Sequence, residues 1–503
     1  MAAVSPYDTL CRLTRETALL QSVEALIGWD ERTYMPPAAG EYRAEQMTYL
    51  SGIIHQRRTD RRIGELLESL AASPLTKDKH SDEATTIRQL QRDYVKQIKL
   101  PQTLVEELTR ASVLGQQAWV EARKNNDFPS FAPHAKKLFE LKRQQAAALG
   151  YKASPYDALL DDFEPDALTA DVAKVLADLR KELVPLVQAI QQAKKRPDSS
   201  ILAREYPTAG QEAFGKAAAA AVGFDFHRGR LDVTHHPFCS GMGPHDCRLT
   251  TRYDEHFFPC ALFGTLHEAG HGMYDQGLRP ELFGLPPGMY VSLGIHESQS
   301  RMWENLVGRS RAFWQHFYPK FKETFPVVRD VSLDDFYFAI NGVQPSLIRV
   351  EADEATYNLH IIVRFELEQA LLSGDLPVDD LPGAWREKYQ QYLGIEPLDD
   401  ADGCLQDVHW SAALIGYFPT YSLGNLYAAQ FFEQADKDLG GLAAQFSCGD
   451  FAPLLQWLQR NIHHRGQCYT AAELVQLVTG KPLTHAPLIR HLRAKLEPLY
   501  GLA

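Results

Sequence analysis

Two histidines four residues apart, His267 and His271, are the residues of this sequence best suited to bind a metal ion. On a helix, this spacing places both imidazoles on one face, one turn apart, where they can hold a single zinc ion. Glu268 follows the first histidine, so its carboxylate can take a proton from a water molecule at the metal. An amphipathic helix with two ordinary histidines is the alternative, but residues 257–266 are almost wholly apolar. Histidines in a buried helix need polar partners, so the sequence favours a metal site.

A catalytic zinc site also needs a third protein ligand, and it leaves one coordination position for water. The next helical stretch, Val291–Phe313, offers Glu297, and Glu304 lies two turns later on a similar face. Spacing alone favours Glu297 only weakly. Asp275, one turn after His271, could reach the metal side as a hydrogen-bond acceptor for a ligand. Cobalt or manganese could replace zinc in a His/His/Glu site, because metal availability as well as affinity decides occupancy.

Helices are expected to position these residues, because apolar side chains recur with the helical period along most of the chain. This pattern predicts successive helices over the first 220 residues. They cover Asp8–Ile27, Tyr42–His55, Arg61–Ala72, Asp82–Ile98, Gln102–Arg123, Phe131–Ala148 and Asp166–Lys194. Helical patterns resume near Phe257 and continue to the end of the chain.

The pattern changes between these helical regions. Val, Thr, Phe and Tyr are frequent in Leu231–Cys239 and Cys247–Tyr253, and Ser240–Pro244 between them contains glycine. This composition predicts a small antiparallel sheet near the zinc site, with a turn at Ser240–Pro244. We find no internal repeat and no low-complexity linker. The expected organisation is one mostly helical domain, 1–503, with a helical N-terminal part, 1–220, and a metal-binding catalytic part, 221–503.

Composition narrows the choice of partner and compartment. The net charge of −12 favours solubility and argues against nucleic acid as a partner. Seven cysteines lie scattered without a CxxC pair, which favours a reducing compartment such as the cytoplasm over a disulfide scaffold. The segment up to Asp30 reads as an amphipathic helix rather than a signal peptide. No run of about 18 apolar residues occurs, so we expect no membrane span.

Several further motifs accompany the His267–His271 pair in order. They are Trp29-Asp30, Met35-Pro36, Arg43-Ala44-Glu45-Gln46, His236-Pro237-Phe238, Asp246-Cys247-Arg248-Leu249-Thr250, His296-Glu297-Ser298-Gln299, Ile348-Arg349-Val350-Glu351-Ala352-Asp353, Gly403-Cys404-Leu405-Gln406-Asp407-Val408-His409-Trp410 and Gly416-Tyr417-Phe418-Pro419-Thr420-Tyr421. With these motifs, nearly the whole chain resembles the carboxypeptidase Taq family of metal-dependent peptidases.

The resemblance implies a mostly helical fold with a deep central groove, related to the folds of neurolysin and angiotensin-converting enzyme. It also implies release of single residues from peptide C-termini with broad specificity, and a homodimer. It also implies that Glu297 is the third metal ligand, a choice that the spacing of Glu297 and Glu304 left open.

Residues outside the metal motif have proposed roles as well. Attack of water on a peptide carbonyl produces a negatively charged oxygen, the oxyanion, which needs hydrogen-bond donors. By analogy with the related groove peptidases, we expect His409 and Tyr421 to be these donors, with Tyr417 as a substitute for Tyr421. These tyrosines could instead be core aromatics at helical spacing. Arg349 is the candidate for binding the substrate's terminal carboxylate. Alternatively, it could form an ion pair with Asp353, which lies four residues later in the same helical stretch.

The histidines before the first glycine-containing turn provide a last candidate. The family motif selects His236 to line the groove beside the metal, and on a strand the neighbouring His235 would face the other side.

Two other functions are alternatives to a metallocarboxypeptidase. An endo-oligopeptidase of the same fold would share every metal-binding residue. A non-enzymatic peptide-binding protein would be expected to lack a ligand or the base, yet His267, His271, Glu297 and Glu268 are all present. A peptide-cleaving metallocarboxypeptidase is therefore the expected function.

Overall fold

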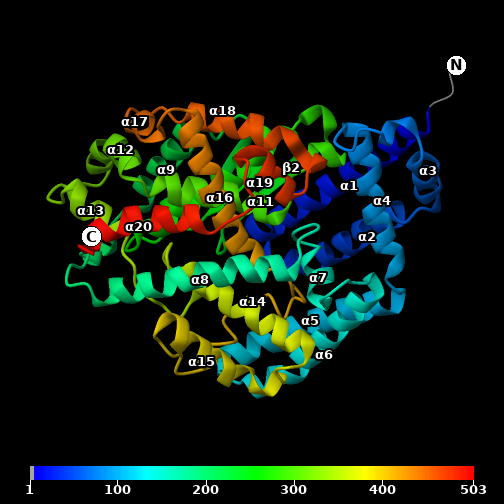
Figure 1. Ribbon diagram of the computed structural model, residues 1–503, viewed down its shortest axis with the longest axis horizontal. Helices are drawn as coiled ribbons and strands as arrows, with labels where there is room; N and C mark the ends of the chain where they lie inside the picture. The colour runs from blue at the N-terminus through cyan, green and yellow to red at the C-terminus, as the bar shows by residue number, and fades with distance from the viewer. Residues whose placement is uncertain (1–4, 503) are drawn as a thin grey trace. The chain divides into compact units, whose positions relative to one another are not determined.

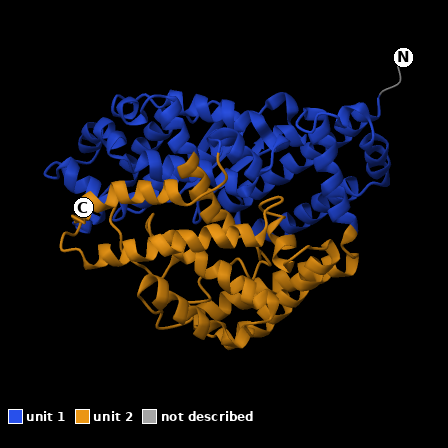
Figure 2. Cartoon of the chain, in the orientation of Figure 1, with its two compact units in different colours: residues 1–98, 198–340, 431–480 blue, residues 99–197, 341–430, 481–503 orange. Residues whose placement is uncertain are grey.

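Helices make up most of the computed structural model, which describes residues 5–502 (Figure 1). The chain forms two compact units, each assembled from three stretches of sequence (Figure 2). Unit 1 is drawn from residues 1–98, 198–340 and 431–480, and unit 2 from residues 99–197, 341–430 and 481–503. The predicted fold class, mostly helical with a small sheet, is confirmed.

Unit 1 carries the metal-binding motif and the sheet. Its helices are α1 (Pro6–Thr33), α2 (Gly40–Arg58), α3 (Arg61–Ala71), α4 (Asp82–Lys99), α9 (Thr208–Val222), α10 (Phe258–Gly277), α11 (Leu293–Arg301), α12 (Arg311–Thr324), α13 (Leu333–Ile340), α17 (Leu442–Ser447), α18 (Ala452–Asn461) and α19 (Ala471–Thr479). Helix α10 is packed against α9, α11 and the sheet, and most of its residues are buried. This burial fixes the orientation of the helix that carries His267 and His271.

The small sheet differs from the predicted one. Its strands are β1 (Gly229–Val233), β2 (Cys239–Gly243) and β3 (Asp246–Thr251), in the order β1-β3-β2. Strand β3 pairs antiparallel with β2 but parallel with β1, so the sheet is mixed. Most of the predicted turn, Ser240–Pro244, lies in strand β2, and the chain reverses at Pro244 and His245 instead. His245 has a φ of 67°, the left-handed conformation that a tight turn requires.

The predicted helical stretch Val291–Phe313 is also interrupted. It contains α11, then a π-helical segment, Met302–Gly308, and then the start of α12. Ser310 caps α12 by accepting a hydrogen bond from the backbone of Phe313, so a new helix begins there. π-Helical turns are often found at functional sites, and this one carries Glu304.

Unit 2 is helical, and α14 contacts four of its other helices. Its helices are α5 (Gln102–Asn125), α6 (Phe128–Leu149), α7 (Pro155–Leu160), α8 (Thr169–Gln192), α14 (Tyr357–Ser373), α15 (Leu381–Leu393) and α20 (Ala486–Tyr500). Helix α14 packs against α6, α7, α8 and α15, and its buried face includes Arg364 and Glu368. Helix α16 (Pro419–Asp438) begins in unit 2 and continues into unit 1.

Two sequence expectations concern the chain ends and the cysteines. The N-terminal helical prediction matches α1, whereas residues 1–4 lie outside the described residues. Within residues 5–502, no helix combines the length and apolarity that a bilayer span requires. Each of the seven cysteines is a free thiol.

Candidate metal centre

Helix α10 presents His267 and His271 on its one partly open face. The side chains of His267 and His271 are 19% and 17% exposed, while the apolar residues around them are buried. Glu268 is buried on the same helix, with 6% of its surface exposed. Because the histidines are four residues apart, their ring centroids are only 4.9 Å apart.

Helix α11 brings Glu297 to these histidines through an unusually close approach to α10. At Gly270 of α10, a Cβ would be 2.6 Å from both the carbonyl oxygen of Gln299 and the Cα of Ser300. Only glycine allows the two backbones to come so near. The first turn of α11 is fixed by Ser292, whose hydroxyl accepts a hydrogen bond from the backbone of Ile295.

Three ligand atoms converge as a result. The Oε2 atom of Glu297 lies 3.6 Å from Nε2 of His267 and 3.4 Å from Nε2 of His271. His267, His271 and Glu297 form one of the groups whose donor atoms all lie within 4.8 Å of one another. The structure thus brings together the three residues assigned as metal ligands from the sequence.

Glu304 sets the protonation of His267. Its Oε2 atom lies 2.9 Å from Nδ1 of His267, and an ionised carboxylate can only accept a hydrogen bond. His267 therefore donates from Nδ1, and in its neutral form Nε2 is the nitrogen left to bind a metal ion. Glu304, the alternative to Glu297 as third ligand in the sequence, is thus a hydrogen-bond partner of His267.

A second chain of hydrogen bonds sets the protonation of His271. Asp275 Oδ1 lies 3.2 Å from Nε2 of His296, so this nitrogen of His296 is the donor. In a neutral His296 the other nitrogen accepts, and it lies 2.6 Å from Nδ1 of His271. His271 donates from Nδ1 and keeps the lone pair of Nε2 for a metal. Sequence reasoning gave no role to His296, although it adjoins Glu297 in the same motif.

Electrostatics favour the ligand forms of His271 and Glu297, but not that of His267. Burial opposes the protonation of His267, yet the charge of Glu297 and the hydrogen bond with Glu304 outweigh it and raise the pKa of this imidazole. Burial lowers the pKa of His271 to about 4, which keeps its imidazole neutral. Burial opposes the ionisation of Glu297, but the charge of Arg301, with that of His267 when its imidazole is protonated, outweighs burial and holds the pKa of this carboxyl well below its usual range. The Nε atom of Arg301 donates to Oε1 of Glu297 at 2.7 Å, so Oε2 remains directed toward the histidines.

Glu268 has the opposite character. Burial raises the pKa of its carboxyl to about 7, and the negative charges of Glu297 and Glu304 act in the same direction. A carboxylate with a pKa near the working pH is suited to accept and return a proton.

These residues fit a divalent metal ion. Two imidazole nitrogens with free lone pairs and one ionised carboxylate oxygen are the donor set of many catalytic zinc sites. Each of the three ligands is also held by a hydrogen bond through its other polar atom, the arrangement that stabilises metal ligands in proteins.

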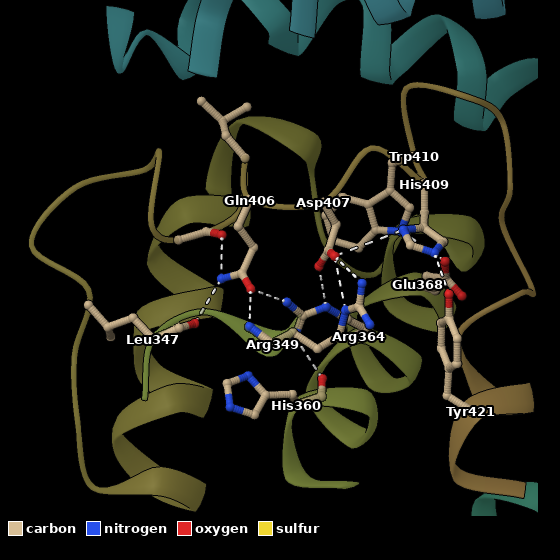
Figure 3. Close-up of polar contacts among 12 residues, drawn as sticks. Leu347, Arg349, His360, Arg364, Glu368, Gln406, Asp407, His409, Trp410 and Tyr421 are labelled. Atoms are coloured by element: carbon tan, nitrogen blue, oxygen red, sulfur yellow. Dashed lines mark hydrogen bonds and ion pairs between the residues drawn. The ribbon is translucent and has the colours of Figure 1, made fainter. Parts of the chain in front are cut away.

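Arg349 lies in a buried polar network of unit 2 (Figure 3). Its Nε and Nη2 atoms donate to Oδ1 of Asp407 at 2.9 and 2.8 Å, while the other oxygen of Asp407 accepts from Nε of Arg364 at 2.6 Å. The carboxylate of Asp353 instead accepts hydrogen bonds from Thr356 and neighbouring backbone groups. The partner of Arg349 is thus Asp407, 58 residues away in sequence, and not Asp353.

His409 and the two tyrosines proposed from sequence cluster in the same unit. His409 Nε2 lies 3.2 Å from the hydroxyl of Tyr421 (Figure 3). The ring of Tyr417 lies 5.4 Å from that of His409. Burial lowers the pKa of His409 to about 3, so its imidazole is neutral. Tyr417 also packs edge-on against Phe163.

His236 lies in the bend between β1 and β2 rather than on a strand. Both His235 and His236 are exposed, so the alternation expected for a strand does not apply to them.

Comparison with known proteins agrees with this architecture. The family model of the carboxypeptidase Taq (M32) metallopeptidases matches residues 9–496. The thermostable carboxypeptidase 1 of Thermus thermophilus is 47% identical over the full length of both chains. Carboxypeptidase 1 of Bacillus subtilis is 40% identical over 99% of this chain and 98% of its own.

Solved structures give the same result for the fold. The M32 carboxypeptidase of Deinococcus radiodurans superimposes with a TM-score of 0.95 at 41% identity, covering 99% of both chains. Metallocarboxypeptidase 1 of Trypanosoma cruzi has a TM-score of 0.92 at 33% identity, covering 97% of this chain and 99% of its own. The chain therefore belongs to the carboxypeptidase Taq (M32) family of metallopeptidases, and it is a peptide hydrolase.

Proposed function

We propose that this protein is a zinc-dependent metallocarboxypeptidase that releases single amino acids from peptide C-termini with broad specificity. The observation that carries the proposal is the convergence of His267, His271 and Glu297, with Glu268 beside the first histidine. Zinc is the proposed ion because the donor set is the His/His/carboxylate set of zinc peptidases. Cobalt and manganese are the proposed substitutes.

The chemical roles follow from these residues. When bound, the metal ion supplies Lewis acidity, which polarises the scissile carbonyl and makes the attacking water more acidic. Glu268 accepts the proton of that water and then delivers it to the leaving amine. The raised pKa of Glu268 supports this assignment, because a carboxyl that titrates near neutrality can both take and release the proton.

His409 and Tyr421 are the proposed donors to the oxyanion that forms when water attacks the carbonyl. A neutral imidazole and a phenol are both able to donate a hydrogen bond to a developing negative charge. The low pKa of His409 supports its role as a neutral donor. Tyr417 and His236 are proposed as substrate-binding residues, with Tyr417 the substitute for Tyr421.

Arg349 is the proposed binding residue for the substrate's terminal carboxylate. Two nitrogens of its guanidinium donate to Asp407, and Nη1 donates to the hydroxyl of Tyr357 at 2.9 Å. A guanidinium has five N–H groups, so these three bonds leave two for a ligand. Asp407 holds the orientation of the arginine in this proposal.

The proposal extends to the state of the protein in the cell. We propose a cytoplasmic homodimer acting on peptides. The seven free cysteines support a reducing compartment, and the dimer is inferred from the family resemblance.

Replacement of Glu268 tests its assignment as the general base. Glu268→Gln keeps the shape of the side chain but removes its proton-accepting capacity, so peptide hydrolysis should fall at least about 100-fold. Metal content is measured on the same sample and should equal that of the wild-type protein. Glu323→Gln, an exposed glutamate of α12, is the control and should keep full activity. Near-normal hydrolysis by the metal-loaded Glu268→Gln protein would reject the assignment.

Paired peptides test the exopeptidase part of the proposal. Peptides of identical sequence with free and amidated C-termini are compared with the wild-type protein. A carboxypeptidase cleaves only the free form well, whereas equal cleavage of both would indicate an endo-oligopeptidase.

A further inference from the structure

A second group of metal-binding side chains lies outside the catalytic centre. Cys239 of β2, Cys247 of β3 and Asp275 of α10 place their donor atoms within 4.8 Å of one another. The two sulfur atoms are 3.5 Å apart. None of these residues belongs to the His267/His271/Glu297 set, and the proposed reaction does not use them.

The register of the two strands explains why the cysteines meet. Cys239 is opposite Leu249 in the antiparallel pair, and Cys247 is opposite Gly241. Because side chains alternate along a strand, Cys247 and Leu249 lie on one face, and Cys239 shares that face. The two thiols are therefore diagonal neighbours across β2 and β3.

Gly241 makes room for the third donor on the same face. It lies directly opposite Cys247, and a Cβ at this position would be 2.8 Å from Oδ2 of Asp275. Any other residue would push the carboxylate away from the two thiols. The absence of a side chain at Gly241 thus allows Asp275 to approach the cysteine pair.

The two oxygens of Asp275 have different surroundings. Oδ1 accepts the hydrogen bond from His296, whereas Oδ2 lies against Gly241 on the side of the sheet. One oxygen can therefore keep its histidine partner while the other binds an ion.

Two sulfur donors and one carboxylate select the class of ion. Thiolates prefer zinc, cadmium and other thiophilic ions over magnesium or calcium. With zinc–sulfur bonds of about 2.3 Å in a tetrahedron, the two sulfurs would be roughly 3.8 Å apart. The observed 3.5 Å requires a side-chain adjustment of only a few tenths of an ångström. Water completes the coordination of such an ion.

We propose that Cys239, Cys247 and Asp275 form a second binding site for a thiophilic divalent cation of the zinc and cadmium class. The site is connected to the catalytic centre through Asp275, His296 and His271, the hydrogen-bonded chain that fixes the orientation of one catalytic ligand. An ion at the cysteines therefore binds to the residue that anchors this chain.

Cadmium titration of the full-length, reduced protein tests the proposal. Cadmium bound to thiolate gives an ultraviolet charge-transfer band, and the His267/His271/Glu297 site contains no sulfur and gives none. The band should grow to saturation at one thiolate-bound cadmium per chain. Cys239→Ser and Cys247→Ser should each remove most of the band. Cys448→Ser, which changes the exposed cysteine, is the matched control and should retain it.

A measurement without variants guards against misfolding, because Cys247 is buried in the sheet. Cadmium-113 NMR of the wild-type protein should show a resonance in the downfield range of thiolate-bound cadmium, separate from that of a nitrogen- and oxygen-bound ion. Absence of both the band and this resonance would overturn the proposal. A band that persists in both the Cys239→Ser and Cys247→Ser proteins would also overturn it. Neither readout depends on peptidase activity.

Discussion

Replacing Gly270 by alanine should weaken metal binding although this residue contacts no metal. Gly270 lies where α10, the helix of the two proposed histidine ligands, meets α11, the helix of Glu297. An added Cβ would lie 2.6 Å from the carbonyl oxygen of Gln299 and from the Cα of Ser300. Both are backbone atoms, so neither can rotate away as a side chain would. The added methyl group must therefore separate the two helices.

The size of the displacement follows from the same distances. Ordinary van der Waals contact begins near 3.4 Å, so the backbones must move apart by about 0.8 Å at this point. A shift of that size moves the carboxylate of Glu297 relative to both imidazoles. Disturbing the support of a metal ligand typically lowers metal affinity ten- to a hundredfold. Overpacking of this kind also costs about 1–3 kcal/mol of stability.

Chelator competition measures the metal affinity, and chemical denaturation of the metal-free protein measures the stability. Gly264→Ala is the matched control on the same helix, because its Cβ would meet only Thr251 Oγ1, at 3.9 Å. That variant should bind metal normally and be as stable as the wild type or about 1 kcal/mol more stable. Wild-type metal affinity in the Gly270→Ala protein would refute the claim that this helix contact positions Glu297.

Three further predictions concern side chains around the site and in unit 2. His296→Phe removes the acceptor for His271 Nδ1 and should lower metal affinity ten- to a hundredfold in the same competition assay; unchanged affinity would show that His296 does not orient the ligand. Burial raises the pKa of Glu368 from 4.5 to about 7, so the folded state binds this proton more tightly than the unfolded state. Its contribution is fully present below pH 4.5, and about 3 kcal/mol is lost as the pH rises to 7. Glu368→Gln should remove this loss, and urea denaturation at pH 4.5 and pH 8 checks it against the wild type; an identical pH dependence in both proteins would contradict the prediction. Asp407→Asn leaves Arg349 and Arg364 buried without their carboxylate and should cost about 3–5 kcal/mol in denaturation, with metal affinity preserved; a cost below 1 kcal/mol would be inconsistent with the network.

The sequence predicted the elements that local periodicity determines. The expected helix Gln102–Arg123 corresponds to α5 (Gln102–Asn125), and Asp82–Ile98 corresponds to α4 (Asp82–Lys99), each within two residues. The spacing of His267 and His271 was sufficient to place both on one helical face. These features depend on residues close together in sequence, where the period of the apolar side chains is informative.

Features that depend on contacts between residues far apart in the chain could not be predicted from the sequence. Arg349 could be paired with Asp353 by spacing, yet it binds Asp407, which only the packing of unit 2 brings near. The sequence predicted an antiparallel sheet, yet strand β1 pairs parallel with β3. This pairing depends on the path of the chain between the two strands, which local sequence does not determine. The roles of Glu304 and His296 depend on the angle between α10 and α11, which is set by the close approach at Gly270.

Anomalous diffraction from crystals loaded with one equivalent of zinc tests the metal centre most directly. We predict an anomalous peak about 2.0–2.2 Å from Nε2 of His267, Nε2 of His271 and a carboxylate oxygen of Glu297. Absence of a peak between the two imidazoles, or a peak that touches them while Glu297 points away, would contradict this claim.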